Sequence, residues 1–299
     1  MQSNMILSII IVNWNTKDFL ISCLESIQKY PPKSQFEVIV VDNNSSDKSV
    51  EYLNLRFNST SFPQLKIILT KKNIGYADGN NIAFEQAQGQ YLLTLNPDTV
   101  VNDNCLQSGI DYLETHPEVG SIGIKQVGVN GNIQRSVRGF PTVLGVIGDS
   151  TGLSSIFPLG KLGSYRLHSF DYTLEQVAPQ PMGTFLMLRR KALEAIGNAL
   201  HPFDSQFPIF FNEVDLLKRL DEAGWKCYYV PSISIIHYGG ESTKQVRKLA
   251  IWESHYSLLR YWKKHSKGIV EKTAIVAITP LVLIAALIRA RGYSRGFRA

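Results

Sequence analysis

The amino-terminal third of the chain alternates between two hydrophobic patterns. Continuous apolar runs rich in β-branched residues occur four times, at Ile6–Asn13, Phe36–Val41, Leu65–Thr70 and Tyr91–Leu95. A run without polar alternation is typical of a strand that is buried on both faces. Because segments with helical spacing separate these runs, the order predicts a parallel sheet with helices on its faces.

The intervening helices have recognisable boundaries. The first covers Asp18–Tyr30 and stops at two prolines, and a second is expected from a cap at Ser46 to about Leu55. A turn with two glycines, Asn73–Gly79, leads into a third helix that ends near Ala87. In sheets of this kind ligands bind beyond the carboxyl ends of the strands, so the polar residues after each strand are the first candidates for a site.

The rest of the chain is less regular. Residues 128–172 are rich in Gly, Ser and Pro and have little periodicity, which is typical of a functional loop or of disorder. Further strands and helices are predicted at Phe185–Leu188, Lys191–Ile196, Glu213–Ala223, Lys226–Val230 and Ile233–His237, from after Ser242 to about Lys264, and at Ile269–Ile288. We therefore expect an α/β domain over residues 1–264 and a helical tail over residues 265–299.

The basic charge of the protein is concentrated near the end of the chain. The formal net charge is +6, but residues 260–299 alone carry nine Lys or Arg and one acid, which leaves −2 for residues 1–259. A body without excess positive charge gives no reason to expect a nucleic-acid partner. The three cysteines are far apart and match no metal-binding spacing, which favours buried thiols in a reducing compartment. No basic segment precedes the first apolar run, which is also too short for a secretory signal.

The tail pattern favours association with a membrane surface. Thr273–Ile288 holds 16 residues without a charge, about 24 Å as a helix, and Pro280 interrupts it. This is shorter than the roughly 30 Å hydrocarbon core of a bilayer. Basic residues flank the segment, and nearby aromatic residues suit the depth of lipid head groups: Tyr256, Tyr261, Trp262 and Tyr293. A helix packed on the domain, a subunit contact and a true span are the alternatives.

Two common nucleotide-binding motifs are absent from the sequence. No Gly-x-Gly-x-x-Gly follows the first strand, where the chain has Val12-Asn13-Trp14-Asn15, and no Walker A sequence occurs. An ordinary dinucleotide or P-loop site is therefore not expected.

Acids and a histidine stand at strand and helix ends instead, and each is ambiguous when taken alone. Asp42 could accept the N3–H of a pyrimidine base or cap the next helix. Asp98 could hold a hard cation on a diphosphate or serve only its turn. Glu213 and Asp215 could act in catalysis or simply complement the helix dipole, and His237 could be a metal ligand or a structural residue.

Three arginines invite further hypotheses. Arg135 and Arg138 lie in the irregular segment and could close over phosphates, meet an anionic lipid-linked acceptor, or be solvated. Arg219 stands four residues after Asp215, which predicts an ion pair on the helix surface.

These motifs occur together in a specific order: Asn13-Trp14-Asn15, Asp42-Asn43-Asn44, Asn73–Asn81, Asn96-Pro97-Asp98-Thr99, Asn212-Glu213-Val214-Asp215-Leu216, Gly224-Trp225 and His237. In this combination the sequence strongly resembles the family 2 glycosyltransferases, in particular their rhamnosyltransferase-like branch, over about residues 6–260. The resemblance implies the GT-A fold, in which a Rossmann-like nucleotide-binding half and an acceptor half share one mixed sheet. It also implies an inverting hexosyl transfer from a nucleoside-diphosphate sugar. The branch favours L-rhamnose from dTDP-rhamnose, with a UDP-hexose donor or a catalytically silent binding homologue as alternatives.

The resemblance also assigns roles by position. Asp98 would bind a metal ion, Mg²⁺ or Mn²⁺, with His237 as a second ligand, and Glu213 would be the catalytic base. Gly183-Thr184 resembles the small-residue turn beside the sugar. The nucleotide would lie against a set of residues at the strand ends: Asn13, Trp14, Asn15, Asp42, Asn44, Asn73, Gly75, Gly79, Asn80 and Asn96.

The acids depart from the family pattern in two places. Asn96 stands where a strict Asp-x-Asp turn has its first acid, and Asn212-Glu213 replaces an acid pair. The longer Glu side chain leaves Asp215 as the alternative base, although successive helix positions point the two carboxylates in different directions. The implied partners are the sugar donor, a glycan or lipid-linked saccharide acceptor and a membrane surface. The implied setting is bacterial cell-surface polysaccharide synthesis, peripheral to the cytoplasmic side of the inner membrane.

Overall fold

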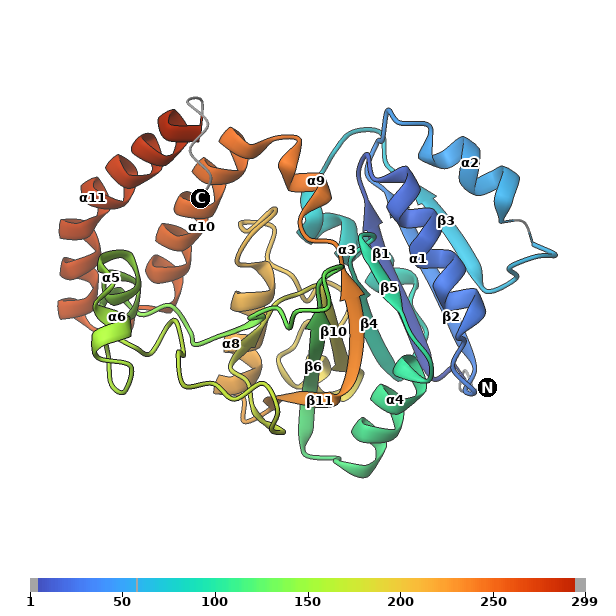
Figure 1. Ribbon diagram of the computed structural model, residues 1–299, viewed down its shortest axis with the longest axis horizontal. Helices are drawn as coiled ribbons and strands as arrows, with labels where there is room; N and C mark the ends of the chain where they lie inside the picture. The colour runs from blue at the N-terminus through green and yellow to red at the C-terminus, as the bar shows by residue number, and fades with distance from the viewer. Residues whose placement is uncertain (1–4, 58, 294–299) are drawn as a thin grey trace.

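The predicted strands form one half of a mixed sheet in the computed structural model, which describes residues 5–57 and 59–293. The order along the sheet is β3, β2, β1, β4, β10, β6, β11 and β5, with β8 paired to β11 (Figure 1). The parallel half consists of β1 (Leu7–Asn13), β2 (Phe36–Asp42), β3 (Leu65–Leu69) and β4 (Tyr91–Leu95).

The second half of the sheet mixes strand directions. β10 (Phe185–Arg189) runs antiparallel to both β4 and β6 (Val119–Val127), whereas β11 (Lys226–His237) is parallel to β6. Two short strands, β5 (Thr99–Val101) and β8 (Gln176–Val177), pair antiparallel with β11. Outside the sheet, β7 (Val137–Arg138) pairs with β9 (Gln180–Pro181). The predicted mixed sheet is confirmed.

Helices cover both faces of the sheet, as the double burial of its strands requires. Ile9 and Ile11 point into the core beneath α1 and α4, while Ile10 and Val12 point into the core beneath α3 and α8. The helices before the tail are α1 (Lys17–Lys29), α2 (Ser49–Arg56), α3 (Gly75–Gln86), α4 (Cys105–Thr115), α5 (Val143–Thr151), α6 (Leu153–Ile156), α7 (Arg190–Ala195), α8 (Asn212–Glu222) and α9 (Glu241–Lys244).

The start of α2 differs from the prediction. The helix begins at Ser49, after Lys48 in the left-handed conformation, and Ser46 does not cap it. Asp47 instead accepts hydrogen bonds from the backbone N–H and the hydroxyl of Ser49. An Asp can serve the turn in this way because its short side chain reaches backbone groups two residues on.

The start of α3 also differs, because a distant residue caps it. The helix begins at Gly75, inside the predicted turn, and the carbonyl of Pro208 accepts the N–H groups of Tyr76 and Ala77. Gly75 has a φ of 87°, and a Cβ there would lie 2.8 Å from the Pro208 carbonyl oxygen. Only glycine tolerates this backbone approach without strain.

Other differences concern elements rather than boundaries. β11 is one strand where two were predicted, and its register against β6 shifts between Val230 and Ser234, around Pro231. α4 and β6 lie in a stretch for which the sequence pattern gave no prediction. The irregular segment 128–172 contains the nine-residue helix α5.

Two long helices lie at the edge of the molecule opposite β3, and the second of them forms the predicted tail (Figure 1). These are α10 (Arg247–His265) and α11 (Ile269–Tyr293), and Pro280 lies inside α11 without ending it. The expectation that Pro280 interrupts the helix is therefore wrong, and 25 residues span about 37 Å. Two of the nine basic residues counted in residues 260–299, Arg295 and Arg298, lie outside the described part of the chain. The side chain of Tyr293 is not described.

One narrow stripe of α11 packs against the body of the protein. Val282, Ala286 and Ala290 are buried at intervals of four residues, while large apolar side chains elsewhere on the helix are exposed: Ile269, Val270, Val276, Leu281, Ile284 and Ile288. Within the described residues, Ile269–Gly292 is long and apolar enough to cross a membrane. Its most apolar 18-residue window has a mean hydropathy of 2.2 and is 17% buried.

Candidate active site

The pairing of β5 with the end of β11 brings Asp98 next to His237. Thr99 lies opposite His237 in this pair, and Tyr238 donates its backbone N–H to the carbonyl of Asp98 at 3.0 Å. Oδ1 of Asp98 lies 3.7 Å from Nε2 of His237, and both side chains are buried. Two candidates from distant parts of the sequence therefore meet at one point.

A residue that the sequence did not single out, Gln134, orients this imidazole. Oε1 of Gln134 lies 2.7 Å from Nδ1 of His237, and Nε2 of Gln134 donates to the His237 carbonyl at 2.9 Å. An acceptor at Nδ1 keeps the proton on that nitrogen and leaves the lone pair on Nε2. This buried Nε2 has no hydrogen-bond partner among the described residues. An orphaned buried polar atom calls for an explanation, and a ligand supplies one.

The residues at this point fit a divalent cation that also binds phosphate. Oδ2 of Asp98 accepts the backbone N–H of Glu241 at 3.2 Å, which leaves Oδ1 directed at the imidazole. Across the described residues, no cluster of three or more His, Cys, Asp or Glu could hold a metal ion. Cations such as Mg²⁺ commonly take one or two protein ligands and complete their shell with substrate phosphates and water. One carboxylate oxygen and one imidazole nitrogen suit that arrangement.

Glu213 stands in the first turn of α8, partly buried, against the turn that carries Gly183. A Cβ on Gly183 would lie 3.5 Å from both Cβ and Cγ of Glu213. The next residue, Thr184, accepts the backbone N–H of Asn96 at 2.9 Å, so this turn connects Glu213 to the turn that holds Asp98. Burial raises the pKa of Glu213 to about 7, although the N–H groups of Glu213 and Val214 partly offset it. A carboxylate with that pKa can exchange protons near neutral pH.

Tyr76, which the sequence did not single out, lies within electrostatic range of both carboxylates. Burial raises its pKa, and the charges of Glu213 and Asp98 raise it further. Its hydroxyl is buried and has no hydrogen-bond partner in the described part of the chain. Because the charges of both acids act on the same hydroxyl, Asp98 and Glu213 belong to the same region.

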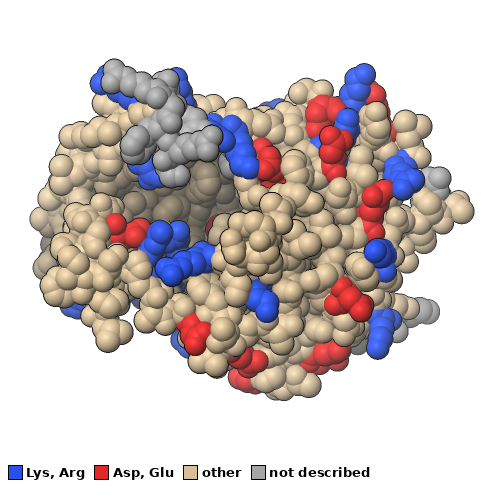
Figure 2. Space-filling model, in the orientation of Figure 1, with Lys and Arg blue, Asp and Glu red and all other residues tan. Residues whose placement is uncertain are grey.

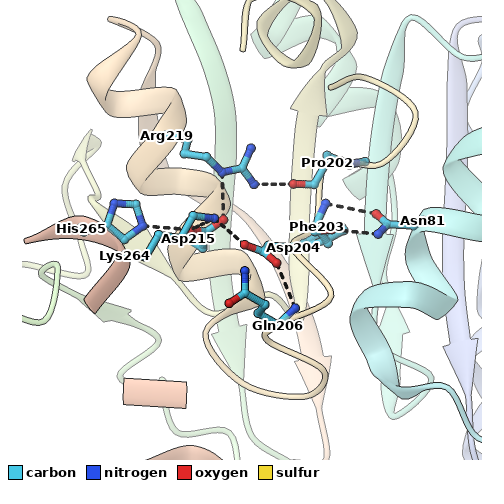
Figure 3. A network of polar contacts seen from close by, with 9 residues as sticks. All are labelled: Asn81, Pro202, Phe203, Asp204, Gln206, Asp215, Arg219, Lys264 and His265. Carbon is cyan, nitrogen blue, oxygen red and sulfur yellow. Dashed lines mark hydrogen bonds and ion pairs between the residues drawn. The ribbon is translucent and has the colours of Figure 1, made fainter. Parts of the chain in front are cut away.

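Asp215 lies in a network with positively charged groups (Figure 3). Its carboxylate lies 2.8 Å from Arg219, 2.7 Å from Lys264 and 2.9 Å from His265. Burial alone would raise its pKa, but the bond to His265 and the charges of Arg219 and Lys264 lower it to about 2. The predicted pair with Arg219 exists but is not on the surface, since Asp215 is fully buried. A carboxylate held by three such partners is a weak proton acceptor, and these contacts favour a structural role for Asp215.

Polar residues at the ends of β1 and β2 bind one another. Nδ2 of Asn13 donates to Oδ1 of Asp42 at 2.9 Å, and Oδ2 of Asp42 accepts the Ser45 N–H at 2.9 Å. Asp42 therefore does not cap α2. Asn15 and Asn44 adopt left-handed conformations, with φ of 52° and 61°.

Asn43, also missed from the sequence, joins this group to the segment before α3. Its Nδ2 donates to Oδ1 of Asn73 at 3.0 Å, and its Oδ1 accepts the N–H of Ile74 at 2.9 Å. Asn73 itself is exposed and accepts the N–H of Gly75. The position of Asn43 inside the Asp42-Asn43-Asn44 motif was the sequence signal that could have identified it.

Gly79 and Asn80 do not lie on a loop as predicted, because α3 already includes them. A Cβ on Gly79 would lie 2.9 Å from Cγ1 of Val12, so the glycine allows α3 to pack closely on β1. Asn80 is fully buried and donates to the Tyr76 carbonyl at 2.8 Å. Trp14 and Asn96 remain partly exposed.

A surface pocket lies elsewhere. It has a volume of about 710 Å³ and is lined by α3, by the segment before α8, and by Arg219 and Lys264 (Figure 3). Neither Asp98, His237 nor Glu213 lines it. Figure 2 shows a separate hollow in the part of the view where Figure 1 shows α10. The candidate site is therefore identified by its side-chain chemistry rather than by pocket size.

Solved structures with the same arrangement of elements are glycosyltransferases. The mannosyltransferase PcManGT from Pyrobaculum calidifontis, solved with GDP-Man and Mn²⁺, matches with a TM-score of 0.58 and 14% identity, over 98% of this chain and 76% of that one. Residues 1–349 of TarS from Staphylococcus aureus match with a TM-score of 0.54 and 19% identity, over 83% of this chain and 65% of that one, slightly less than two thirds of its length. The architecture is therefore the GT-A fold, as predicted.

The model of glycosyl transferase family 2 matches residues 8–197, and the chain belongs to that family. It is 24% identical over 223 residues to the N-acetylglucosaminyl-diphospho-decaprenol L-rhamnosyltransferase of Mycobacterium tuberculosis, covering 69% of this chain and 67% of the relative. It is 24% identical over 261 residues to the rhamnosyltransferase WbbL of Escherichia coli, covering 85% and 91%. The predicted family and its rhamnosyltransferase relatives are confirmed.

Proposed function

We propose that this family 2 glycosyltransferase transfers a hexose, with inversion, from a nucleoside-diphosphate sugar to a glycan or lipid-linked saccharide. One observation carries the proposal: a buried imidazole nitrogen without a partner lies 3.7 Å from the Asp98 carboxylate, in the same region as a partly buried glutamate. The first pair suits a cation on a diphosphate, and the glutamate suits the acceptor hydroxyl.

In this proposal Glu213 is the catalytic base. Inversion requires a base on the face of the sugar opposite the departing diphosphate, within hydrogen-bond reach of the acceptor hydroxyl. Glu213 takes the proton from that hydroxyl as its oxygen bonds to the anomeric carbon. Asp98 and His237 would hold Mg²⁺ or Mn²⁺, which when bound would supply positive charge beside the leaving diphosphate. A neighbour solved with Mn²⁺ supports this choice of ions.

The donor sugar is L-rhamnose, as the names of two relatives suggest, and the resemblance to the rhamnosyltransferase-like branch favours dTDP as its carrier. Its base and ribose lie at the ends of β1 and β2, against Asn13, Trp14, Asn15, Asp42 and Asn44, with Asn73, Gly75 and Asn96 nearby. Asp42 retains lone pairs beyond those used by Asn13 and Ser45, and these suit the N3–H of a pyrimidine. A UDP-hexose offers the same N3–H and is the alternative donor, since TarS was solved with UDP-GlcNAc.

The acceptor is a saccharide at a membrane surface, and the product belongs to bacterial cell-surface glycan. Residues 1–264 form the catalytic unit, and residues 265–299 associate with the cytoplasmic side of the inner membrane. The exposed apolar side chains of α11 and its flanking basic residues support this placement. The name of the mycobacterial relative describes a transferase that acts on a lipid-linked saccharide, and this supports a membrane location as well.

A thermal-shift screen identifies the donor, because a ligand that binds the native state raises the melting temperature. dTDP-rhamnose with Mn²⁺ should give the largest shift among nucleoside diphosphates and their sugars. Donor hydrolysis should then be slower in Glu213→Gln than in the wild type.

The substitutions Asn96 and Asn212 favour a second candidate, a silent binding homologue. That candidate is correct if the donor raises the melting temperature but is neither hydrolysed nor transferred.

A further inference from the structure

The small sheet of β7 and β9 places Arg138 next to the candidate base. Arg138 lies opposite Gln180, and Met182 donates its N–H to the carbonyl of Ser136 at 2.8 Å. The next residue along β9 and its turn is Gly183, which packs against Glu213. The strand that carries Arg138 therefore borders the turn on which Glu213 rests.

The guanidinium of Arg138 has no ionic partner within residues 5–57 and 59–293. It is half-buried over the ring of Tyr165, 5.6 Å from the ring centroid. Among the described residues it makes no ion pair and no hydrogen bond, whereas Arg166 pairs with Asp149 at 3.6 Å. A guanidinium presents five N–H donors in a planar fork, which matches the oxygens of a phosphate.

Other charges mark the same area. Burial raises the pKa of Tyr165. The charge of Arg138 opposes this rise and the charge of Glu213 adds to it, so both charged groups lie within electrostatic range of the Tyr165 hydroxyl. Burial also raises the pKa of Tyr172, and the charges of Arg138, Arg135 and Arg166 all oppose that rise. Figure 2 shows basic side chains along the lower edge of the hollow. Positive charge thus gathers beside the glutamate, in a protein whose residues 1–259 carry no net positive charge.

Beyond the arginines the surface becomes apolar. The segment from α5 to just past α6 exposes four large side chains: Leu144, Ile156, Phe157 and Leu159. Val143 and Val146 of α5 pack against the cluster that includes Ile275 and Val282 of α11. The order along this side of the molecule is therefore carboxylate, guanidinium, apolar surface. A ligand that presents a hydroxyl, then phosphate, then hydrocarbon has the complementary order.

We propose that Arg138 binds a phosphate group that joins the acceptor sugar to a lipid, with Arg135 contributing further positive charge. The acceptor is then a saccharide on a lipid phosphate or diphosphate, and its hydrocarbon chain leaves over α5 and α6. This inference rests on the proposed function, since it assumes that the acceptor binds beside Glu213.

The test is a binding measurement on the full chain saturated with dTDP and Mn²⁺. Three synthetic probes carry the same sugar, N-acetylglucosamine, on one alkyl chain through a diphosphate, a monophosphate or a neutral glycosidic bond. The wild type should bind the diphosphate probe at least about tenfold more tightly than the neutral glycoside, as expected for charge-assisted bonds. Arg138→Gln should reduce that ratio to near one, and Arg138→Lys should retain part of it.

Arg56→Gln is the matched control, because it removes the same charge from an exposed arginine of α2 that pairs with Glu25 at 2.8 Å. It should bind all three probes like the wild type. Equal wild-type affinity for the three probes, or an unchanged ratio in Arg138→Gln with a wild-type melting temperature, overturns the inference. Equal affinity for inorganic pyrophosphate and the diphosphate probe also overturns it, since the site would then recognise phosphate without the lipid-linked sugar. Donor hydrolysis by the wild type tests the proposed function separately, because the binding ratio requires no turnover.

Discussion

The chemistry available to His237 depends on a neighbour that the sequence pattern does not mark. Gln134 both accepts from Nδ1 and donates to the His237 carbonyl, so it controls the ring orientation and the position of its proton. The lone pair on Nε2 consequently faces Oδ1 of Asp98. Partners of this kind tune metal-binding histidines throughout proteins.

Replacing Gln134 should therefore weaken metal binding without touching a ligand. Gln134→Leu removes the acceptor at Nδ1, and we expect Mn²⁺ affinity in the presence of dTDP to fall about 10–100-fold. Gln134→Glu keeps an acceptor there and should retain most of the affinity. A metal titration followed by intrinsic fluorescence measures both. Equal affinity in Gln134→Leu and the wild type would show that this contact does not matter for the ion.

The raised pKa of Glu213 makes the rate depend on pH. The base must be ionised, and its pKa is about 7, so kcat should fall about tenfold per pH unit below that value and level off above it. Glu213→Gln should lower kcat by about 10²–10⁴-fold and remove this acid limb. Steady-state rates between about pH 5 and 9 provide the measurement. A wild-type acid limb that persists in the variant would assign the titration to another group.

At the scale of elements, α8 is held from two directions. Its first turn carries Glu213 beside the Gly183 turn, while Asp215 binds Lys264 and His265 at the end of α10 (Figure 3). The network therefore joins the helix that carries the candidate base to the helix that leads into the tail.

Breaking this network should cost stability. Asp215 is fully buried, and removing one partner of a buried pair typically costs about 3–5 kcal/mol. Because Lys264 and Arg219 are partly exposed, we expect Asp215→Asn to lose about 3 kcal/mol in urea unfolding. Asp221→Asn, which breaks an exposed pair with Lys226, should lose at most about 1 kcal/mol. A similar loss in both variants would contradict a special role for the buried network.

The pH dependence of that stability follows from the lowered pKa of Asp215. Its pKa falls from the ordinary 3.8 to about 2 in the folded protein, so the stabilisation is present above pH 3.8 and is lost as pH falls through about 2. The difference between wild type and Asp215→Asn should shrink over that window.

The elements that the sequence predicted well are those whose pattern is local. β1 to β4 were predicted because strands buried on both faces consist of uninterrupted apolar runs. The start of α3 was not, because Pro208 caps it from far along the chain. The three-residue strand β5 has too little pattern to predict, yet it brings Asp98 to His237.

The candidate site shows the same division. Family motifs pointed to Asp98, Glu213 and His237, which carry the distinctive chemistry. Gln134 stands in an irregular segment where no periodicity or motif marks a residue, and Tyr76 lies inside the Asn73–Asn81 motif, which does not single it out. Their importance follows from contacts and electrostatics that only the fold creates.

At the scale of the whole molecule, the tail is one buried stripe and one exposed apolar surface. The stripe of Val282, Ala286 and Ala290 packs inward. Exposed apolar area of this extent on a helix marks a contact with a membrane or a protein. With basic residues at both ends, a membrane surface is the occupant we propose.

Deleting residues 268–299 should release the protein from membranes while donor hydrolysis survives. A second variant guards against unfolding on truncation: Val276→Asp, Ile284→Asp and Ile288→Asp together change only exposed positions of α11. Flotation with anionic liposomes should show loss of binding in both variants, with an unchanged melting temperature in the second. Continued flotation of the triple variant would mean that another surface binds the lipid.

The most direct measurement is electron paramagnetic resonance of Mn²⁺ added to the protein with dTDP. The wild type should bind one ion whose signal changes when dTDP is added, and Glu213→Gln should bind it equally. Asp98→Asn and His237→Ala should each bind it far more weakly, by about 100-fold or more, because each removes one of two protein ligands. If both variants bind Mn²⁺ with dTDP as the wild type does, Asp98 and His237 do not form the cation site.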